Sequence, residues 1–209
     1  MSGSPARSAA SWRAIHEACS WLATHTVRNQ ATVGGNITAA HFPSDLPPVL
    51  IALDSTLVVQ GEDGRREFPV EDLYIRRSEV HRKGDLIVEV RIPAGASGRV
   101  SAFEKTGRAR VDIAIVNCAV ALALADGLVE SARIALGGLA AGPVPAREAA
   151  KFLVGKEPGA GTFAEAGRLV ASSVSPRSDH RASADYRRKM AGALTERALT
   201  RAALRENAK

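Results

Sequence analysis

Cysteine, aromatic residues and long apolar segments are all scarce in this 209-residue chain. Its two cysteines, Cys19 and Cys118, form no Cys-x-x-Cys pair, which excludes a disulfide scaffold and a four-thiolate metal site. No apolar run reaches the roughly 18 residues that a membrane-spanning helix needs. Residues 1–11 lack the apolar segment of a secretory signal and are expected to form a flexible tail. A globular, cytoplasmic protein is therefore expected.

The sequence also lacks the residue patterns of covalent and metal-assisted catalysis. It has no Gly-x-Ser-x-Gly elbow, and neither cysteine has a histidine directly beside it that could activate the thiol. His41 has no cysteine or second histidine nearby, so we expect it at a pocket rim or on the surface and not as a metal ligand. The sequence thus predicts no catalytic nucleophile and no metal site in this chain.

Basic residues outnumber acidic ones by 28 to 22, but the excess is confined to one segment. Residues 167–209 carry 10 basic and 4 acidic side chains, a difference that equals the whole net charge of +6. Tyr186 is the single aromatic residue of that segment, whereas proteins that bind nucleic acids on a basic face use aromatic side chains to stack on bases. We therefore expect no nucleic-acid partner. The segment is expected to be a solvated surface or, alternatively, a subunit interface.

Hydrophobic spacing predicts an α+β protein that divides near residue 100. In the first half, helical patterns cover residues 12–23, 37–40 and 45–53, and a β-hairpin over residues 56–70 precedes a strand at 85–92. In the second half, strands at 117–125 and 129–136 meet at Asp126-Gly127, and helices are expected at 146–153, 162–172 and 183–204.

Two of these elements also carry predictions about burial. On the strand at 85–92, strict alternation predicts that Leu86, Val88, Val90 and Ile92 share one buried face. On the last helix, a stripe of Tyr186, Met190 and Leu194 at helical spacing is expected to pack in the core.

The segment Thr32-Val33-Gly34-Gly35-Asn36 is the first chemical signal. Two glycines let a ligand approach the backbone closely, and successive N–H groups can bind a phosphate, particularly if a helix starts at Asn36. The alternative is that the glycine pair only reverses the chain. The segment is neither a Walker loop nor the six-residue dinucleotide fingerprint, because the required lysine and third glycine are absent. Asp45 could bind ligand hydroxyls, cap the helix that follows it, or do both.

Six patterns follow one another along nearly the whole chain: RNQATVGGNI at 28–37, SDLPPVL at 44–50, AFEK at 102–105, DIA at 112–114, RIALGG at 133–138 and DHRASADYRR at 179–188. Their order and spacing resemble the FAD-binding subunit of the molybdenum hydroxylases, the family of xanthine dehydrogenase and carbon monoxide dehydrogenase. Several motifs in one order are more specific than any single glycine pair.

The resemblance implies a fold, a cofactor and a set of site residues. Residues 12–100 would form the second lobe of an FAD-binding domain of the vanillyl-alcohol-oxidase type. Residues 101–209 would form a small antiparallel sheet with helices, like the C-terminal domain of the CO dehydrogenase flavoprotein. The residues implied to contact FAD are Thr32, Val33, Gly34, Gly35, Asn36, Asp45, Ile87 and Lys105.

The family also implies partner chains. A large subunit holds molybdopterin and binds the substrate, and a small subunit holds [2Fe-2S] clusters that pass electrons to FAD and then to an acceptor. Relatives have an earlier lobe with its own glycine-rich loop, for which this sequence has no counterpart, so only part of the FAD site is expected. A separate chain could supply that lobe, or the gene could be a truncated or split version. A flavin-free assembly or docking module is the alternative function. The chain alone is expected to be inactive.

Overall fold

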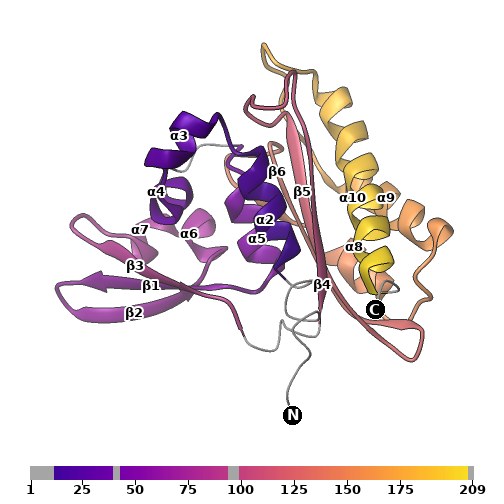
Figure 1. The fold of residues 1–209 in the computed structure, drawn as a ribbon, viewed down its shortest axis with the longest axis horizontal. Helices are drawn as coiled ribbons and strands as arrows, with labels where there is room; N and C mark the ends of the chain where they lie inside the picture. Colours follow the sequence, from indigo (N-terminus) through magenta and orange to yellow (C-terminus); the bar gives the residue numbers. More distant parts are fainter. Residues whose placement is uncertain (1–11, 40–42, 94–98, 207–209) are drawn as a thin grey trace.

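Two antiparallel sheets, with helices between and around them, make up the fold (Figure 1). The computed structural model of the chain describes residues 12–39, 43–93 and 99–206, so the predicted tail and His41 lie outside the described residues. The strand order is β2-β1-β3 in one sheet and β4-β5-β6-β7 in the other. The α+β class predicted from hydrophobic spacing is therefore confirmed.

The first half consists of short helices and the three-stranded sheet. Its elements are α2 (Arg13–Trp21), α3 (His25–Gln30), α4 (Val33–Thr38), α5 (Leu46–Ala52), β1 (Thr56–Gly61), β2 (Gly64–Pro69), α6 (Asp72–Ile75), α7 (Arg77–Val80) and β3 (Leu86–Arg91). The predicted hairpin is confirmed, because β1 and β2 pair antiparallel from Thr56↔Pro69 to Gly61↔Gly64.

Helices α3 and α4 correct two predictions. Residues 25–30 have no apolar periodicity, yet they form α3, because the Thr24 side chain accepts a hydrogen bond from the N–H of Val27 and caps the helix. Helix α4 begins at Val33 and not after Asn36, because Thr32 takes the N-cap position. The double glycine therefore lies inside the first turn of a helix and does not reverse the chain.

Strand β3 forms where expected, but its predicted buried face is only half correct, because Val90 and Ile92 pack on the core whereas Leu86 and Val88 do not. Leu86 and Val88 are 66% and 47% exposed. The register against β1 shifts, so that Val58 pairs with Glu89 and Val59 with Ile87. This irregularity gives β3 one extra residue and reverses its alternation, so that Ile87 packs on the core beside Val90.

The second half is the four-stranded sheet with three helices. Its elements are β4 (Val100–Thr106), β5 (Val116–Ala125), β6 (Leu128–Gly137), β7 (Val144–Pro145), α8 (Arg147–Leu153), α9 (Ala160–Ser173) and α10 (Ala184–Glu206). The predicted turn at Asp126-Gly127 is confirmed, since both residues have positive φ angles, 52° and 76°, as a tight hairpin turn requires. The predicted strands and helices of this half are also confirmed, within a few residues at their ends.

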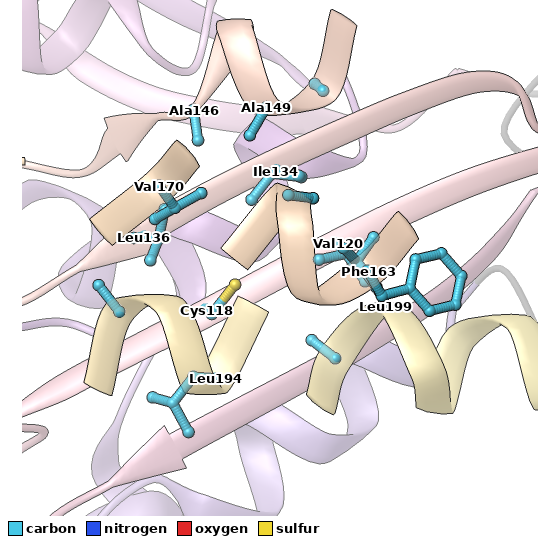
Figure 2. Packing of buried hydrophobic residues seen from close by; sticks show 14 of the residues in the cluster. Cys118, Val120, Ile134, Leu136, Ala146, Ala149, Phe163, Val170, Leu194 and Leu199 are labelled. Carbon is cyan, nitrogen blue, oxygen red and sulfur yellow. The ribbon is translucent and has the colours of Figure 1, made fainter. Parts of the chain in front are cut away.

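One face of the larger sheet packs against α8, α9 and α10. Figure 2 shows Cys118, Val120 and Ile134 of the strands beside Phe163 and Val170 of α9 and Leu194 and Leu199 of α10. The predicted stripe on α10 is only partly correct, because Leu194 is buried but Tyr186 is 43% exposed. The buried face of this helix is centred instead on small side chains and on Arg187, which is fully buried.

The opposite face of the same sheet packs against the first half. Because side chains alternate along a strand, Phe103, Ala119, Ala121 and Ala135 point away from α10 and join the hydrophobic core formed by α2, α5 and β1. Helices therefore cover both faces of the larger sheet (Figure 1). Among the described helices, none has the length and apolar character needed to cross a membrane.

Candidate functional site

Helix α4 presents its glycine-containing first turn toward a cleft. The N–H groups at the start of a helix have no intrahelical partner, and here Thr32 Oγ1 accepts a hydrogen bond from the N–H of Gly35 at 2.9 Å. A Cβ atom on Gly35 would also lie only 2.9 Å from Thr32 Oγ1, whereas one on Gly34 would meet nothing within 4 Å. The compact cap therefore requires glycine at position 35 but not at position 34.

A buried cluster of polar side chains lies beside this turn. Asp45 Oδ2 accepts a hydrogen bond from Lys105 Nζ at 2.6 Å, and Asp45 Oδ1 accepts one from Asn117 Nδ2 at 2.8 Å. The Lys105 ammonium also donates to the carbonyl of Trp21, at 3.3 Å. Asp45, Lys105 and Asn117 are 4%, 7% and 0% exposed, so this cluster joins α2, the start of α5 and two strands of the larger sheet with very little exposure to water.

Burial and pairing act on the Asp45 carboxyl in opposite directions. Burial raises the pKa of Asp45 above its ordinary value, while the charge of Lys105 and the hydrogen bonds from Lys105 and Asn117 lower it. The effect of burial is the largest, so the net shift is upward. The sequence left open whether Asp45 caps α5, binds ligand hydroxyls, or does both. Asp45 stands at the N-cap position of α5, but its side chain makes no capping hydrogen bond. Of these alternatives, only ligand binding remains.

A cleft of about 500 Å³ brings most of the predicted site residues together. Five of the eight line it: Thr32, Gly35, Asn36, Asp45 and Lys105. Val33 and Gly34 belong to the same helical turn but do not line the cleft. Ile87 lies on β3, packed against the core of the first half, and does not line the cleft either.

The rim of the cleft is largely apolar. It is formed by Leu22, Val27 and Ala31 on one side and by Val111 and Ile113 on the other. The turn between α2 and α3 that carries Leu22 is fixed by a guanidinium group, since Arg28 Nη1 donates to the carbonyls of Leu22 and Ala23 at 2.7 Å each. A ligand in this cleft would thus meet an apolar entrance and a polar floor.

Asn36 carries a buried acceptor oxygen beside the cleft. Its Oδ1 atom is buried and, within the described part of the chain, has no hydrogen-bond partner. Buried carbonyl oxygens normally have a partner, because leaving one unpaired costs free energy. Asn36 lines the cleft, but this oxygen has almost no accessible surface, so a ligand would reach it only once the amide turns toward the cleft.

The sequence analysis gave no individual role to two fully buried polar residues, Asn117 and Arg187. Asn117 was included only in a predicted strand, although a polar residue inside an apolar run was the available signal. Arg187 was quoted only as part of a motif, yet it donates to the carbonyls of Ile115 and Gly138 at 2.5 and 2.8 Å and to both oxygens of Asp179 at 2.8 Å. It thus holds the end of β6 against the start of β5.

Two protein-family models match the chain. The model described as the FAD binding domain in molybdopterin dehydrogenase matches residues 5–95, and the one described as the CO dehydrogenase flavoprotein C-terminal domain matches residues 101–202. The two matches together span nearly the whole chain.

Curated relatives agree with these matches. The carbon monoxide dehydrogenase medium chain of Hydrogenophaga pseudoflava is 32% identical over 189 residues, which cover 90% of this chain and 66% of the relative. The glyceraldehyde dehydrogenase medium chain of Sulfolobus acidocaldarius is 31% identical over 185 residues, which cover 88% of this chain and 66% of the relative. The matched region is thus slightly less than two thirds of the length of each relative.

A solved structure shows the same fold. Carbon monoxide dehydrogenase from Hydrogenophaga pseudoflava, in a form that lacks the Mo-pyranopterin moiety of the molybdenum cofactor, matches 97% of this chain and 70% of its own chain. The TM-score is 0.88 and the sequence identity 32%. The chain therefore belongs to the family of FAD-binding medium chains of molybdenum hydroxylases of the carbon monoxide dehydrogenase and xanthine dehydrogenase type.

Proposed function

We propose that this chain forms part of the FAD site of a multisubunit molybdenum hydroxylase. Electrons from iron–sulfur clusters on a partner chain would reach FAD at this site and leave to an acceptor. The observation that carries the proposal is the convergence of Thr32, Gly35, Asn36, Asp45 and Lys105 on one cleft. All five are among the eight residues that the family resemblance assigns to flavin contacts. Among the described residues, none donates a hydrogen bond to the side-chain oxygen of Asn36.

The side chains present fit FAD. A dinucleotide carries hydroxyl and N–H donors as well as phosphate oxygens, and the cleft offers both kinds of partner. Asn36 and Asp45 supply acceptor oxygens, while Thr32 and Lys105 supply donors. The chemistry that FAD supplies when bound is electron transfer, for which the protein needs no nucleophile. The role of these residues is therefore to bind, orient and desolvate.

The partners are proposed from the family. A large chain would hold molybdopterin and the substrate, and a small chain would hold the [2Fe-2S] clusters. Because the chain matches only part of its relatives, we propose that further protein, either a separate chain or additional sequence, completes the FAD site. Val33, Gly34 and Ile87 remain proposed contacts that such a completed site would use.

FAD titration of an Asn36→Leu variant tests the proposal. Leucine has nearly the same size and removes the unpaired oxygen, so we expect the stability of the FAD-free chain to stay the same or rise. Loss of one hydrogen bond to the cofactor should weaken FAD binding by up to about tenfold. Fluorescence quenching of FAD measures the affinity, for the full chain alone and co-expressed with molybdenum and iron–sulfur chains.

Asn29→Leu is the matched control. Asn29 lies on the neighbouring helix α3, is exposed and does not line the cleft, so the same substitution there should leave FAD affinity unchanged. Purified complex without visible flavin absorbance would reject the proposal and favour a flavin-free docking module. Equal effects of the two variants on FAD affinity would also count against the site.

A further inference from the structure

Asn117 is a fully buried polar side chain at the second position of an otherwise apolar strand, β5. In the register of the larger sheet it lies directly between Lys105 of β4 and Gly137 of β6. Residues opposite one another in a sheet point to the same face, and Lys105 points to the cleft. The amide of Asn117 therefore lies behind the cleft, next to the floor of the proposed FAD site.

The two ends of this amide have different surroundings. Nδ2 donates to Asp45 Oδ1 at 2.8 Å and to the carbonyl of Ser44 at 3.2 Å. Oδ1 is buried with no hydrogen-bond partner in the ranges that the structure describes. A Cβ atom at position 137 would lie 2.3 Å from that oxygen, so Gly137 is what makes room for the amide.

Packing alone does not explain an asparagine at position 117. A buried oxygen without a donor destabilises the fold, and an apolar side chain of similar size would avoid that cost. The benefit must come from the Nδ2 donor. It binds one oxygen of Asp45 while Lys105 binds the other, at 2.6 Å. Two donors, one at each oxygen, prevent the carboxylate from rotating and leave a lone pair on each oxygen for a further donor.

We propose that Asn117 is a positioning residue of the FAD site, which fixes the Asp45 carboxylate as an acceptor for a hydroxyl or N–H group of the bound cofactor. The inference rests on the proposed function and adds a residue outside the cleft lining. It also explains the glycine at position 137, since a side chain there would push the amide away from Asp45.

Two substitutions at position 117 separate positioning from packing. Asn117→Leu preserves volume and removes the donor, whereas Asn117→Ser keeps a donor and leaves a cavity. Positioning predicts that the leucine variant weakens FAD binding by about tenfold and the serine variant by less. If Asn117 served only for packing, the serine variant would be the more damaging of the two, because it leaves a cavity that lowers stability. The measurements are the FAD dissociation constant and the melting temperature of the FAD-free chain.

Cys118→Ala is the matched control on the same strand. Cys118 points to the opposite face, where its Sγ lies 3.6 Å from Thr195 Oγ1, so this variant should lower the melting temperature without changing FAD affinity. If the leucine variant does not fold, Asn117→Val replaces it, because β-branched residues suit strands. The positioning role would be overturned if the wild-type chain binds FAD but the serine variant binds it more weakly than the leucine variant does. That outcome would leave the proposed function intact. Absence of FAD from the wild-type chain, alone and in complex, would reject both.

Discussion

The side chains of Lys105 and Asp45 form an ion pair that is almost inaccessible to solvent, with 1% and 5% exposure. Removing each charge from water costs several kcal/mol, and good geometry with additional hydrogen bonds has to offset that cost. The carbonyl of Trp21 and the amide of Asn117 supply those hydrogen bonds. Such a pair contributes little net stability, but loss of one partner leaves a buried charge uncompensated.

Lys105→Met should therefore destabilise the chain strongly. We expect the free energy of unfolding at neutral pH to fall by about 3–5 kcal/mol. With the cation gone, the folded-state pKa of Asp45 rises further above its unfolded value. Between the two pKa values, Asp45 of the folded variant holds a proton that Asp45 of the unfolded chain has released. The stability of the variant is therefore greatest below the unfolded-state pKa of Asp45 and is lost as the pH rises through the folded-state pKa. Urea unfolding of the variant should accordingly show partial recovery in acid.

The double variant Lys105→Met/Asp45→Asn is the control for this effect. It removes both charges, so most of the lost stability should return and the added pH dependence should disappear. Equal instability of the single and double variants would show that the aliphatic stem of Lys105, and not the charge balance, is what matters.

At the scale of the secondary-structure elements, helix α4 depends on the geometry of its first turn. It has only six residues, two of which are glycines, and its start is defined by the hydrogen bond between Thr32 Oγ1 and the Gly35 N–H. Short isolated helices are marginal in water. Contacts such as the Tyr74 hydroxyl donating to the Ile37 carbonyl at 2.9 Å, and Arg77 donating to the Thr38 carbonyl at 2.8 Å, hold its C-terminal end.

Alanine at each of the two glycines should have opposite effects on this helix. Gly34→Ala places a methyl group in open space and should raise the free energy of unfolding by about 0.5 kcal/mol through helix propensity. Gly35→Ala places its methyl group 2.9 Å from Thr32 Oγ1, disturbs the cap and should cost about 1 kcal/mol. Chemical denaturation measures both; stabilisation by Gly35→Ala would contradict the described cap.

At the scale of the whole molecule, an ion-pair network joins the N-terminal and C-terminal helices. Glu17 on α2 binds Arg201 and Arg205 of α10, and its other contact is the N–H of Phe103 on β4, at 2.9 Å. Arg201 also pairs with Glu104. The predicted division near residue 100 stays a prediction, but the described residues on either side of it share one hydrophobic core and this network.

Glu17→Gln tests how much the network contributes. The Glu17 side chain is 12% exposed, so its hydrogen bonds to charged and backbone donors are largely protected from water. We expect a loss of about 1–3 kcal/mol in the free energy of unfolding. Glu79→Gln is the matched control, because Glu79 pairs with Arg76 while 64% exposed, and surface pairs of this kind contribute between about 0 and 1 kcal/mol. Similar losses from both variants would mean that the network adds nothing beyond an ordinary surface pair.

The local sequence by itself determined the elements whose signals are short-range. The hairpins at residues 56–70 and 117–136, the three C-terminal helices and the family motifs were all readable, because turn residues and hydrophobic periodicity act within a few positions. Thr32, Gly35, Asn36 and Asp45, which the family resemblance groups together, also line one cleft, but their contact with FAD stays a prediction.

Only the tertiary structure decided what depends on distant partners. The irregularity that reverses the faces of β3 arises from its pairing with β1. The burial of Arg187 depends on carbonyls just before β5 and just after β6. Asp45 could be a cap or a ligand contact in the sequence; its pairing with Lys105 and Asn117 links residues 60 and 72 positions apart. Electrostatic and packing energies of this kind depend on distances in space, which spacing along a chain does not encode.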